Sequence, residues 1–138
     1  LSVMLEHPSF AKPPPKSLDR MDFGLDAVAW LSPADGAATL AAFTAACVRR
    51  AAAHLPSSPA RWIVCGGGRH NPALMEALGV FLDAPVCAAE DVGWRGDFLE
   101  AEAFAYLAAR SVKGLPLSLP STTGVPKPTT GGRLHRPA

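Results

Sequence analysis

The sequence predicts an α/β fold, arranged as a parallel βαβα unit with a helix in front of it. Two short apolar runs, RWIVC at residues 61–65 and APVCAA at residues 84–89, have the length of buried strands. Each precedes a stretch with helical spacing, and this order implies a right-handed parallel connection with helices covering the sheet. Two strands are too few for a stable sheet. Either more strands lie in the N-terminal segment or, as we favour, partner strands are missing from this chain.

The helix before the first strand is predicted over residues 32–55. Ser32 is a good N-cap, and Pro33 suits the first helical position. Because apolar side chains recur at helical spacing, we expect one buried stripe on this helix. Its members are Leu40, Phe43, Cys47, Ala51 and Leu55.

The other two helices are marked by their ends. Asn71 is a suitable N-cap for the second, with Pro72 at its first position. The third is expected over residues 97–113, where Gly114 stops it. The expected apolar face of the second helix consists of Leu74, Leu78 and Phe81 or Leu82.

The composition divides the chain into three parts. Residues 1–30 form a proline-rich connector and entry segment, in which prolines forbid a long helix. Residues 31–116 hold the α/β portion, and residues 117–138, rich in Pro, Gly and Thr, form a C-terminal loop and tail.

The totals exclude several classes of function. A net charge of +1 with scattered basic residues argues against a nucleic-acid partner. No apolar run approaches a membrane span, and no signal peptide is visible, so a cytoplasmic protein without a membrane partner is expected. Cysteines and histidines lack metal-ligand spacing, and no metal site is predicted. We expect three reduced, buried thiols, at Cys47, Cys65 and Cys87.

Three consecutive glycines, Gly66, Gly67 and Gly68, follow the first strand. In a parallel sheet ligands bind at the carboxyl ends of strands, and glycine lets a ligand lie against the backbone. The next helix points its N-terminus there, which suits a nucleotide or another anion. A Walker A loop is excluded because no lysine follows, and Asn71 stands where a dinucleotide fingerprint needs its third glycine. A tight glycine-rich turn without a ligand remains the alternative.

Glu100 is the second candidate. On a helical wheel it aligns with Phe104, Leu107 and Ser111, at the edge of the apolar side, where a carboxylate needs a partner or a function. Glu102, by contrast, falls on the polar side with Tyr106 and Arg110. The alternative for Glu100 is a favourable interaction with the helix dipole in the first turn.

Five segments in this order resemble the C-terminal part of the anhydro-N-acetylmuramic acid kinase family. They are PPPKS with the following Arg20, VCGGGRHNPALM, Asp91 with Gly93, EAEAFAYLAARSVKGLP and LPSTTG, and the resemblance runs from about Leu1 to Gly124. It implies part of a ribonuclease H-like domain of the sugar kinase, heat-shock protein and actin superfamily, incomplete relative to the family. It also implies a kinase that uses ATP and Mg²⁺ to open 1,6-anhydro-N-acetylmuramic acid with water and phosphorylate it, in peptidoglycan recycling.

The resemblance assigns roles to the candidate residues. Gly66, Gly67, Gly68 and Asn71 would form the ATP-binding adenosine motif, and Glu100 would help to bind the amino sugar. The family's Gly-Thr-Ser-x-Asp-Gly phosphate loop and catalytic aspartate do not occur in this sequence. No catalytic residue is therefore assigned here. The expected partner is a missing N-terminal half of the same protein, and this chain alone is expected to be inactive.

Two other functions remain open from the sequence. One is a non-catalytic nucleotide-binding or interaction module of the same superfamily, and the other is a nicotinamide-dependent fragment with an altered fingerprint. The exposed sheet edge of such a half-domain also predicts poor solubility or self-association, of which a homodimer is one form. Departures from the family pattern, such as Leu18 and Asp19 after the Lys16–Ser17 pair, leave the roles of this loop and of residues 121–124 open.

Overall fold

The computed structural model describes residues 1–135. Its helices and strands are α1 (Ser2–Leu5), α2 (Pro33–Ala52), β1 (Trp62–Val64), α3 (Pro72–Phe81), β2 (Val86–Ala88), α4 (Leu99–Val112) and α5 (Pro120–Thr123). Short 3₁₀ turns lie at Pro8–Ala11, Arg20–Asp22, Gly67–His70 and Ala89–Val92. Within the described residues, no helix has both the length and the apolar character to cross a membrane.

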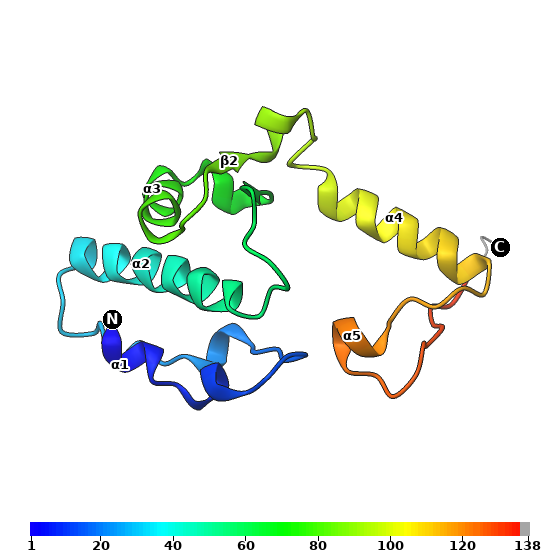
Figure 1. The fold of residues 1–138 in the computed structure, drawn as a ribbon, viewed down its shortest axis with the longest axis horizontal. Coiled ribbons are helices and arrows are strands. Elements are labelled where there is room, and N and C mark those ends of the chain that lie inside the picture. Colours follow the sequence, from blue (N-terminus) through cyan, green and yellow to red (C-terminus); the bar gives the residue numbers. More distant parts are fainter. Residues whose placement is uncertain (136–138) are drawn as a thin grey trace.

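The sheet has the parallel order that the sequence predicts. β1 pairs with β2 in the register Trp62 to Val86, Ile63 to Cys87 and Val64 to Ala88. α3 connects the two strands, and α2 lies alongside α3 (Figure 1). In the described part of the chain these two strands form the one sheet, and the N-terminal segment forms helical turns instead of strands. The α/β class is therefore confirmed.

α2 is the central element because it packs on two sides. Toward α3 and the sheet, Ala45 joins Leu78 and Leu82 in one apolar cluster. Toward the N-terminal segment, Phe43 joins Met4 and Val28 in a second cluster. The predicted single stripe is wrong, because small alanines between the large residues let a second face approach α3. Two members of that stripe, Ala51 and Leu55, are exposed.

The N-terminal segment covers one side of α2 with aromatic side chains. The rings of Phe10 and Phe23 both meet the Phe43 ring edge-on, at centroid distances of 6.3 and 5.1 Å. The Arg50 guanidinium lies 5.0 Å from the centroid of the Phe10 ring. These contacts hold a proline-rich connector, which has little secondary structure, against the α/β portion.

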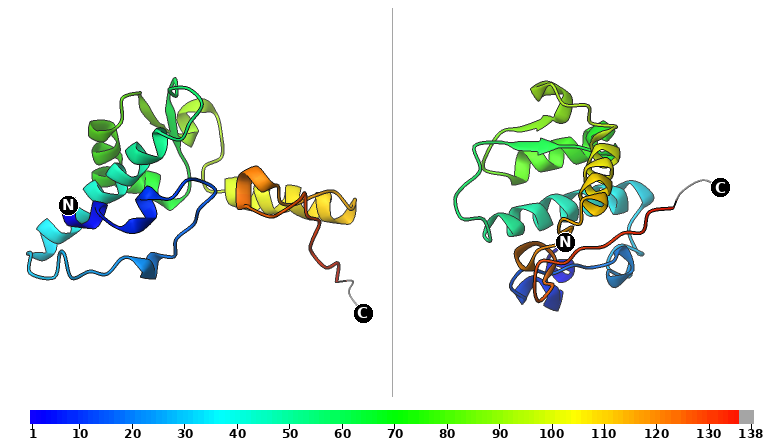
Figure 2. Two further views of the ribbon diagram at one scale, coloured as in Figure 1. Left: turned by 60° about the horizontal axis from the view of Figure 1, so that its bottom comes forward. Right: turned by 90° about the vertical axis from the view of Figure 1, so that its right-hand side faces the viewer.

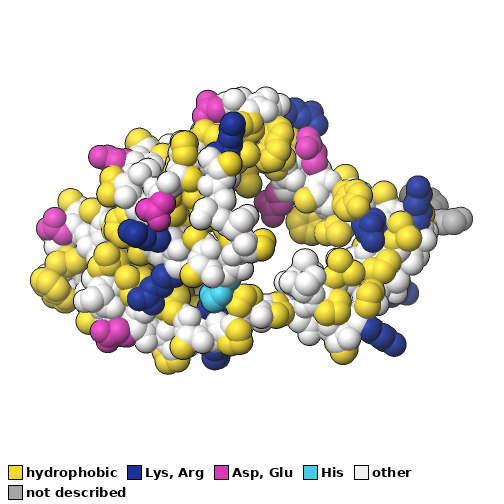
Figure 3. All heavy atoms as spheres, viewed as in Figure 1, with side chains coloured by type: hydrophobic (Ala, Val, Ile, Leu, Met, Phe, Trp, Pro, Cys, Tyr) yellow, Lys and Arg dark blue, Asp and Glu magenta, His cyan; other side chains and the backbone are white. Residues whose placement is uncertain are grey.

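α4 extends away from this packed body (Figures 1 and 2). It forms where predicted, and Gly114 follows it with a positive φ of +66°. None of its described residues is buried, and Phe104 and Val112 are 64% and 68% exposed. Helices were expected to cover the sheet, and α4 instead leaves its apolar side exposed. Figure 3 shows hydrophobic side chains at the surface of this arm.

The segment after α4 is more ordered than the predicted loop. Ser118 and Thr129 form an isolated antiparallel bridge around α5. The Ser111 hydroxyl donates a hydrogen bond to the Gly131 carbonyl oxygen at 2.6 Å, which ties this segment to α4. The last three residues of the predicted tail, 136–138, lie outside the described part of the chain.

Candidate functional site

The glycine joint is the run Gly66–Gly68, which begins two residues after β1 ends, at the carboxyl edge of the sheet. Gly66 has φ +70° and ψ −175°, a conformation that residues with a side chain adopt only at a cost in strain. The Gly66 amide donates to the Gly96 carbonyl at 3.4 Å, so the joint also touches the segment that leads from β2 to α4. Three glycines thus form a turn that is held at its first residue.

Open space adjoins the backbone of this joint. A Cβ added to Gly66 or to Gly67 would meet no atom within 4 Å, whereas one added to Gly68 would lie 3.2 Å from the Leu74 Cδ2 atom. A side chain at position 68 would require Leu74 to move by a few tenths of an ångström, and backbone strain favours glycine at position 66. At Gly67 neither reason applies, and the space beside it is available to a ligand.

Asn71 caps α3 as the sequence predicts. Its side-chain oxygen accepts a hydrogen bond from the Leu74 amide at 3.3 Å, and Pro72 occupies the first turn. The apolar face of α3 is also confirmed, since Leu78 and Leu82 are buried. The N-terminus of α3 is consequently anchored within a few residues of Gly67, and a helix N-terminus interacts favourably with anions.

A buried arginine beneath the glycine joint was not singled out from the sequence. The Arg69 side chain is 2% exposed, and its Nη1 atom donates to the Gly66 carbonyl at 2.8 Å. Its Nε and Nη2 atoms donate to the Glu90 carboxylate at 2.8–3.0 Å. Nη2 also lies 2.7 Å from Asp97 Oδ1, which is 3.3 Å from His70 Nε2. The guanidinium thus joins the turns after both strands.

The charges of this network stabilise one another. The hydrogen bonds to Glu90 and then Asp97 raise the pKa of Arg69 above its ordinary value, against the effect of burial. The hydrogen bond from Arg69 lowers the pKa of the Glu90 carboxyl group, and the same partner, followed by His70, lowers the pKa of Asp97. All three side chains are therefore charged near neutral pH.

The sequence did carry a signal for this network. The carboxyl ends of two parallel strands meet at one edge, so charged residues just after each strand come together. Arg69 follows β1, while Glu90 and Asp97 follow β2. Gly96 completes the arrangement, because a Cβ there would lie 2.4 Å from Arg69 Nε.

Glu100 lies on the exposed first turn of α4, three residues after Asp97. The side on which it was predicted to border a buried surface is itself exposed here. Glu102 is exposed as predicted, and it forms an ion pair with Arg95. Tyr106 accepts a hydrogen bond from Arg110 at 3.1 Å, which confirms that these two polar residues are neighbours.

Two segments whose roles the sequence left open meet in the structure. Pro15, Lys16 and Ser17 line a small pocket of about 220 Å³ together with Thr122 and Thr123. The Lys16 ammonium group is occupied there, since it donates to three backbone carbonyls, those of Ser9, Phe10 and Lys12. Its three N–H donors are therefore used within the chain, where they hold the connector loop in place.

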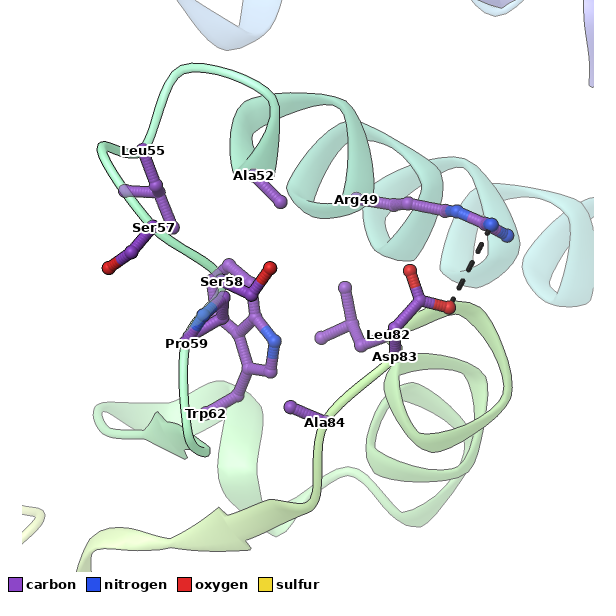
Figure 4. Close-up of a pocket in the computed structure, with 10 residues that line it drawn as sticks. All are labelled: Arg49, Ala52, Leu55, Ser57, Ser58, Pro59, Trp62, Leu82, Asp83 and Ala84. Atoms are coloured by element: carbon purple, nitrogen blue, oxygen red, sulfur yellow. Dashed lines mark ion pairs between the residues drawn. The ribbon is translucent and has the colours of Figure 1, made fainter.

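A separate pocket of about 320 Å³ lies at the opposite edge of the sheet (Figure 4). The Trp62 side chain forms part of its wall, and Arg49 and Asp83 form an ion pair at 3.9 Å beside it. Trp62 begins β1 and Ala84 precedes β2, so this pocket is at the amino ends of the strands. It is distinct from the glycine joint.

The three cysteines are less buried than predicted. Cys65, next to the joint, is exposed, and Cys47 and Cys87 are partly buried. Burial raises the pKa of the Cys47 thiol, although Arg50 partly offsets this effect. Cys65 was expected to be buried, but β1 ends at Val64, so Cys65 lies outside the strand.

The fold and the site together define an α/β unit with a two-stranded parallel sheet and exposed glycine backbone at the carboxyl edge of that sheet. Sequence comparison gives its family: residues 1–136 match the profile of anhydro-N-acetylmuramic acid kinase, and the chain belongs to this family. It is 59% identical to the anhydro-N-acetylmuramic acid kinase of Caulobacter vibrioides over 97% of its length. The identity is 58% to those of Rhodospirillum rubrum and Nitrobacter winogradskyi, over 96% and 99% of the chain.

The chain spans little more than a third of the length of these relatives, 36%, 35% and 38% respectively. The resemblance found in the sequence is thus confirmed, and so is the expectation that the chain corresponds to only part of a family member. The kinase activity in the family's name is an activity of the relatives as whole proteins.

Proposed function

We propose that this chain supplies the nucleotide-side portion of a cytoplasmic kinase that acts in peptidoglycan recycling. The kinase would use ATP and water to convert 1,6-anhydro-N-acetylmuramic acid to N-acetylmuramic acid 6-phosphate. The observation that carries the proposal is the open space beside Gly66 and Gly67, at the carboxyl edge of a parallel sheet and next to the N-terminus of α3. Membership of an anhydrosugar kinase family makes ATP the ligand to expect there.

In this proposal, the residues of this chain contact the adenosine end of ATP. Gly66, Gly67 and Gly68 would present backbone to the base and ribose, and Asn71 would hold the start of α3 beside them. Glu100 would contact the sugar from the first turn of α4. ATP supplies the transferable phosphoryl group, and Mg²⁺ neutralises charge on the phosphates. Among the described residues no group of three or more acidic, His or Cys side chains is placed to hold a metal ion.

The remaining catalytic parts are assigned outside this sequence. No Gly-Thr-Ser-x-Asp-Gly segment occurs in it, and we name no catalytic base among its residues. Phosphoryl transfer needs donors around the phosphates and a positioned nucleophile. In this proposal, those groups come from the part of the kinase that corresponds to the uncovered length of the relatives.

Replacing Gly67 with alanine tests the proposed contact with adenosine. The added methyl group meets no protein atom, so folding should be unaffected. Against a bound nucleotide it would cause overpacking of about 1–3 kcal/mol, which corresponds to a Kd for ATP that is weaker by about fivefold to about 150-fold. Isothermal titration calorimetry of the purified chain measures this. Gly79→Ala, an exposed position on α3 with equally open space, is the control, and equal Kd values for both variants would refute the contact.

The chain alone should release no ADP above background when it is given ATP and the anhydro sugar. A coupled ADP assay measures this release, and robust turnover would contradict the proposal that the catalytic groups lie outside this chain. Adding the part of the Caulobacter vibrioides relative that this chain does not cover should then produce sugar-dependent ADP release. Glu100→Gln should lower that activity by raising the KM for the sugar, whereas Glu102→Gln, at another exposed position in the first turn of α4, should not.

The alternative is a non-catalytic nucleotide-binding module of the same superfamily, which would use the same open space beside Gly67. Such a module would bind ATP with no dependence on the sugar. Calorimetry with and without the anhydro sugar, in the presence of the complementing part, separates the two functions.

A further inference from the structure

Arg69 contacts three separate segments with one side chain. Nη1 reaches the Gly66 carbonyl in the glycine joint, and Nε and Nη2 reach Glu90 after β2. Nη2 also reaches Asp97, two residues before α4 begins. Contacts to three segments at once require a planar guanidinium with several donors, and a lysine side chain has no such group.

The surroundings of Arg69 fit this role. Its side chain is almost fully enclosed, and Gly96 leaves room for the guanidinium where any Cβ would collide with it. The Gly96 carbonyl in turn accepts from the Gly66 amide. The first residue of the glycine joint is therefore fixed from both sides, at its amide by Gly96 and at its carbonyl by Arg69.

We propose that Arg69 is a positioning residue that sets the glycine joint and the start of α4 in one arrangement. The inference rests on the proposed function, in which Gly66–Gly68 contact ATP and Glu100 contacts the sugar. Asp97 lies three residues before Glu100, so a shift of the guanidinium moves both ligand contacts together. Arg69 touches neither ligand, and its effect is exerted through Gly66 and Asp97.

If Arg69 formed only a structural ion pair, we would expect a different result. It would contribute to stability, and its loss would leave the local geometry of the joint unchanged in molecules that remain folded. A positioning residue changes that geometry in the folded state. Backbone amide chemical shifts of Gly66–Gly68 and of residues 97–100 report on it directly and need no ligand.

The first experiment compares ¹H–¹⁵N spectra of the chain with Arg69→Met, Arg69→Lys and the control Arg61→Met. Arg61 is an exposed arginine just before β1, which makes it a matched control. We expect both Arg69 variants to shift the amides of the joint and of the start of α4, with no rescue by lysine. Unchanged shifts at these positions in a folded Arg69→Met protein would overturn the inference.

The second experiment titrates ATP into the same proteins. We expect a Kd about tenfold weaker for Arg69→Met, within the range for substitutions that act through a neighbouring residue, and no change for Arg61→Met. An unchanged Kd would overturn the inference and leave the proposed function standing. Failure of the unsubstituted chain to bind ATP would instead count against the proposed function, and the spectra would then decide the positioning role alone.

Milder variants cover the case in which Arg69→Met does not fold. Glu90→Gln and Asp97→Asn keep the shape of each partner and remove its charge. Asp97→Asn should shift the amides of residues 97–100 more than those of the joint, because it releases only the contact toward α4. If both variants left the amides of the joint and of α4 unmoved, the inference would be wrong.

Discussion

α2 and α4 are both amphipathic helices, with 20 and 14 residues, yet they differ in how much of their surface is buried. α2 buries Phe43, Ala45 and Ala46 between the N-terminal segment and α3, whereas α4 buries none of its described residues. Helical spacing predicts that an apolar helix face packs against another segment, but it does not identify that segment. The difference is therefore one of available neighbours and not of helix-forming tendency.

The largest effect should come from the same substitution made on each helix. Phe43→Ala should destabilise the chain by about 3–5 kcal/mol, because it leaves a cavity among packed aromatic rings. Phe104→Ala should change stability by no more than about 0.5 kcal/mol, since its side chain is 64% exposed. Urea unfolding followed by circular dichroism measures both.

Protein concentration serves as the control for this pair. If the cost of Phe104→Ala rises with concentration, α4 is covered by self-association in solution. An equal loss from both substitutions at low concentration would contradict the exposed arm.

Helix capping should give a smaller difference between the two helices. The Ser32 hydroxyl oxygen accepts from the Asp35 amide at 3.1 Å, and Ser32→Ala should cost about 1 kcal/mol. Phe98, at the corresponding place in α4, makes no side-chain cap, so Phe98→Ala should stay within about 0.5 kcal/mol. The same unfolding curves provide the measurement, and a Ser32→Ala protein as stable as the parent would disprove the cap.

The predictable parts of the fold are those encoded within a few residues. Asn71 with Pro72 marks the start of α3, and Gly114 marks the end of α4, because a cap or a positive φ is a local requirement. The exposure of Leu55 and the lack of buried residues in α4 could not be predicted in this way. Burial depends on distant segments, and a helical wheel contains no information about them.

The same distinction between local signals and long-range contacts applies to the candidate site. The glycines could be located from the sequence, because three of them exceed the needs of a turn, and the structure adds that Gly67 is free of internal constraint. Whether ATP binds there stays a prediction. Arg69 was missed because its partners Glu90 and Asp97 lie 21 and 28 residues away, and only the pairing of β1 with β2 brings them together.

The smallest effect we expect is the pH dependence of the network that links the packed body to α4. Arg69 lowers the pKa of Glu90 and of Asp97 in the folded state. The stability from these ion pairs is therefore complete above the unfolded pKa values of about 4, and it is lost as the pH falls through the lower folded values. Because Glu90 and Asp97 are 50% and 66% exposed, solvent and salt weaken the effect.

Urea unfolding of the parent and of Glu90→Gln between pH 7 and pH 3 measures this dependence. The gap between the two proteins should be widest at pH 7 and should close toward pH 3, since the parent loses by protonation what the variant lacks at every pH. Glu76→Gln, at an exposed position on α3, should follow the parent throughout. A gap that stays constant with pH would mean that Glu90 contributes through packing and not through its charge, and the ion-pair link between the two regions would then be wrong.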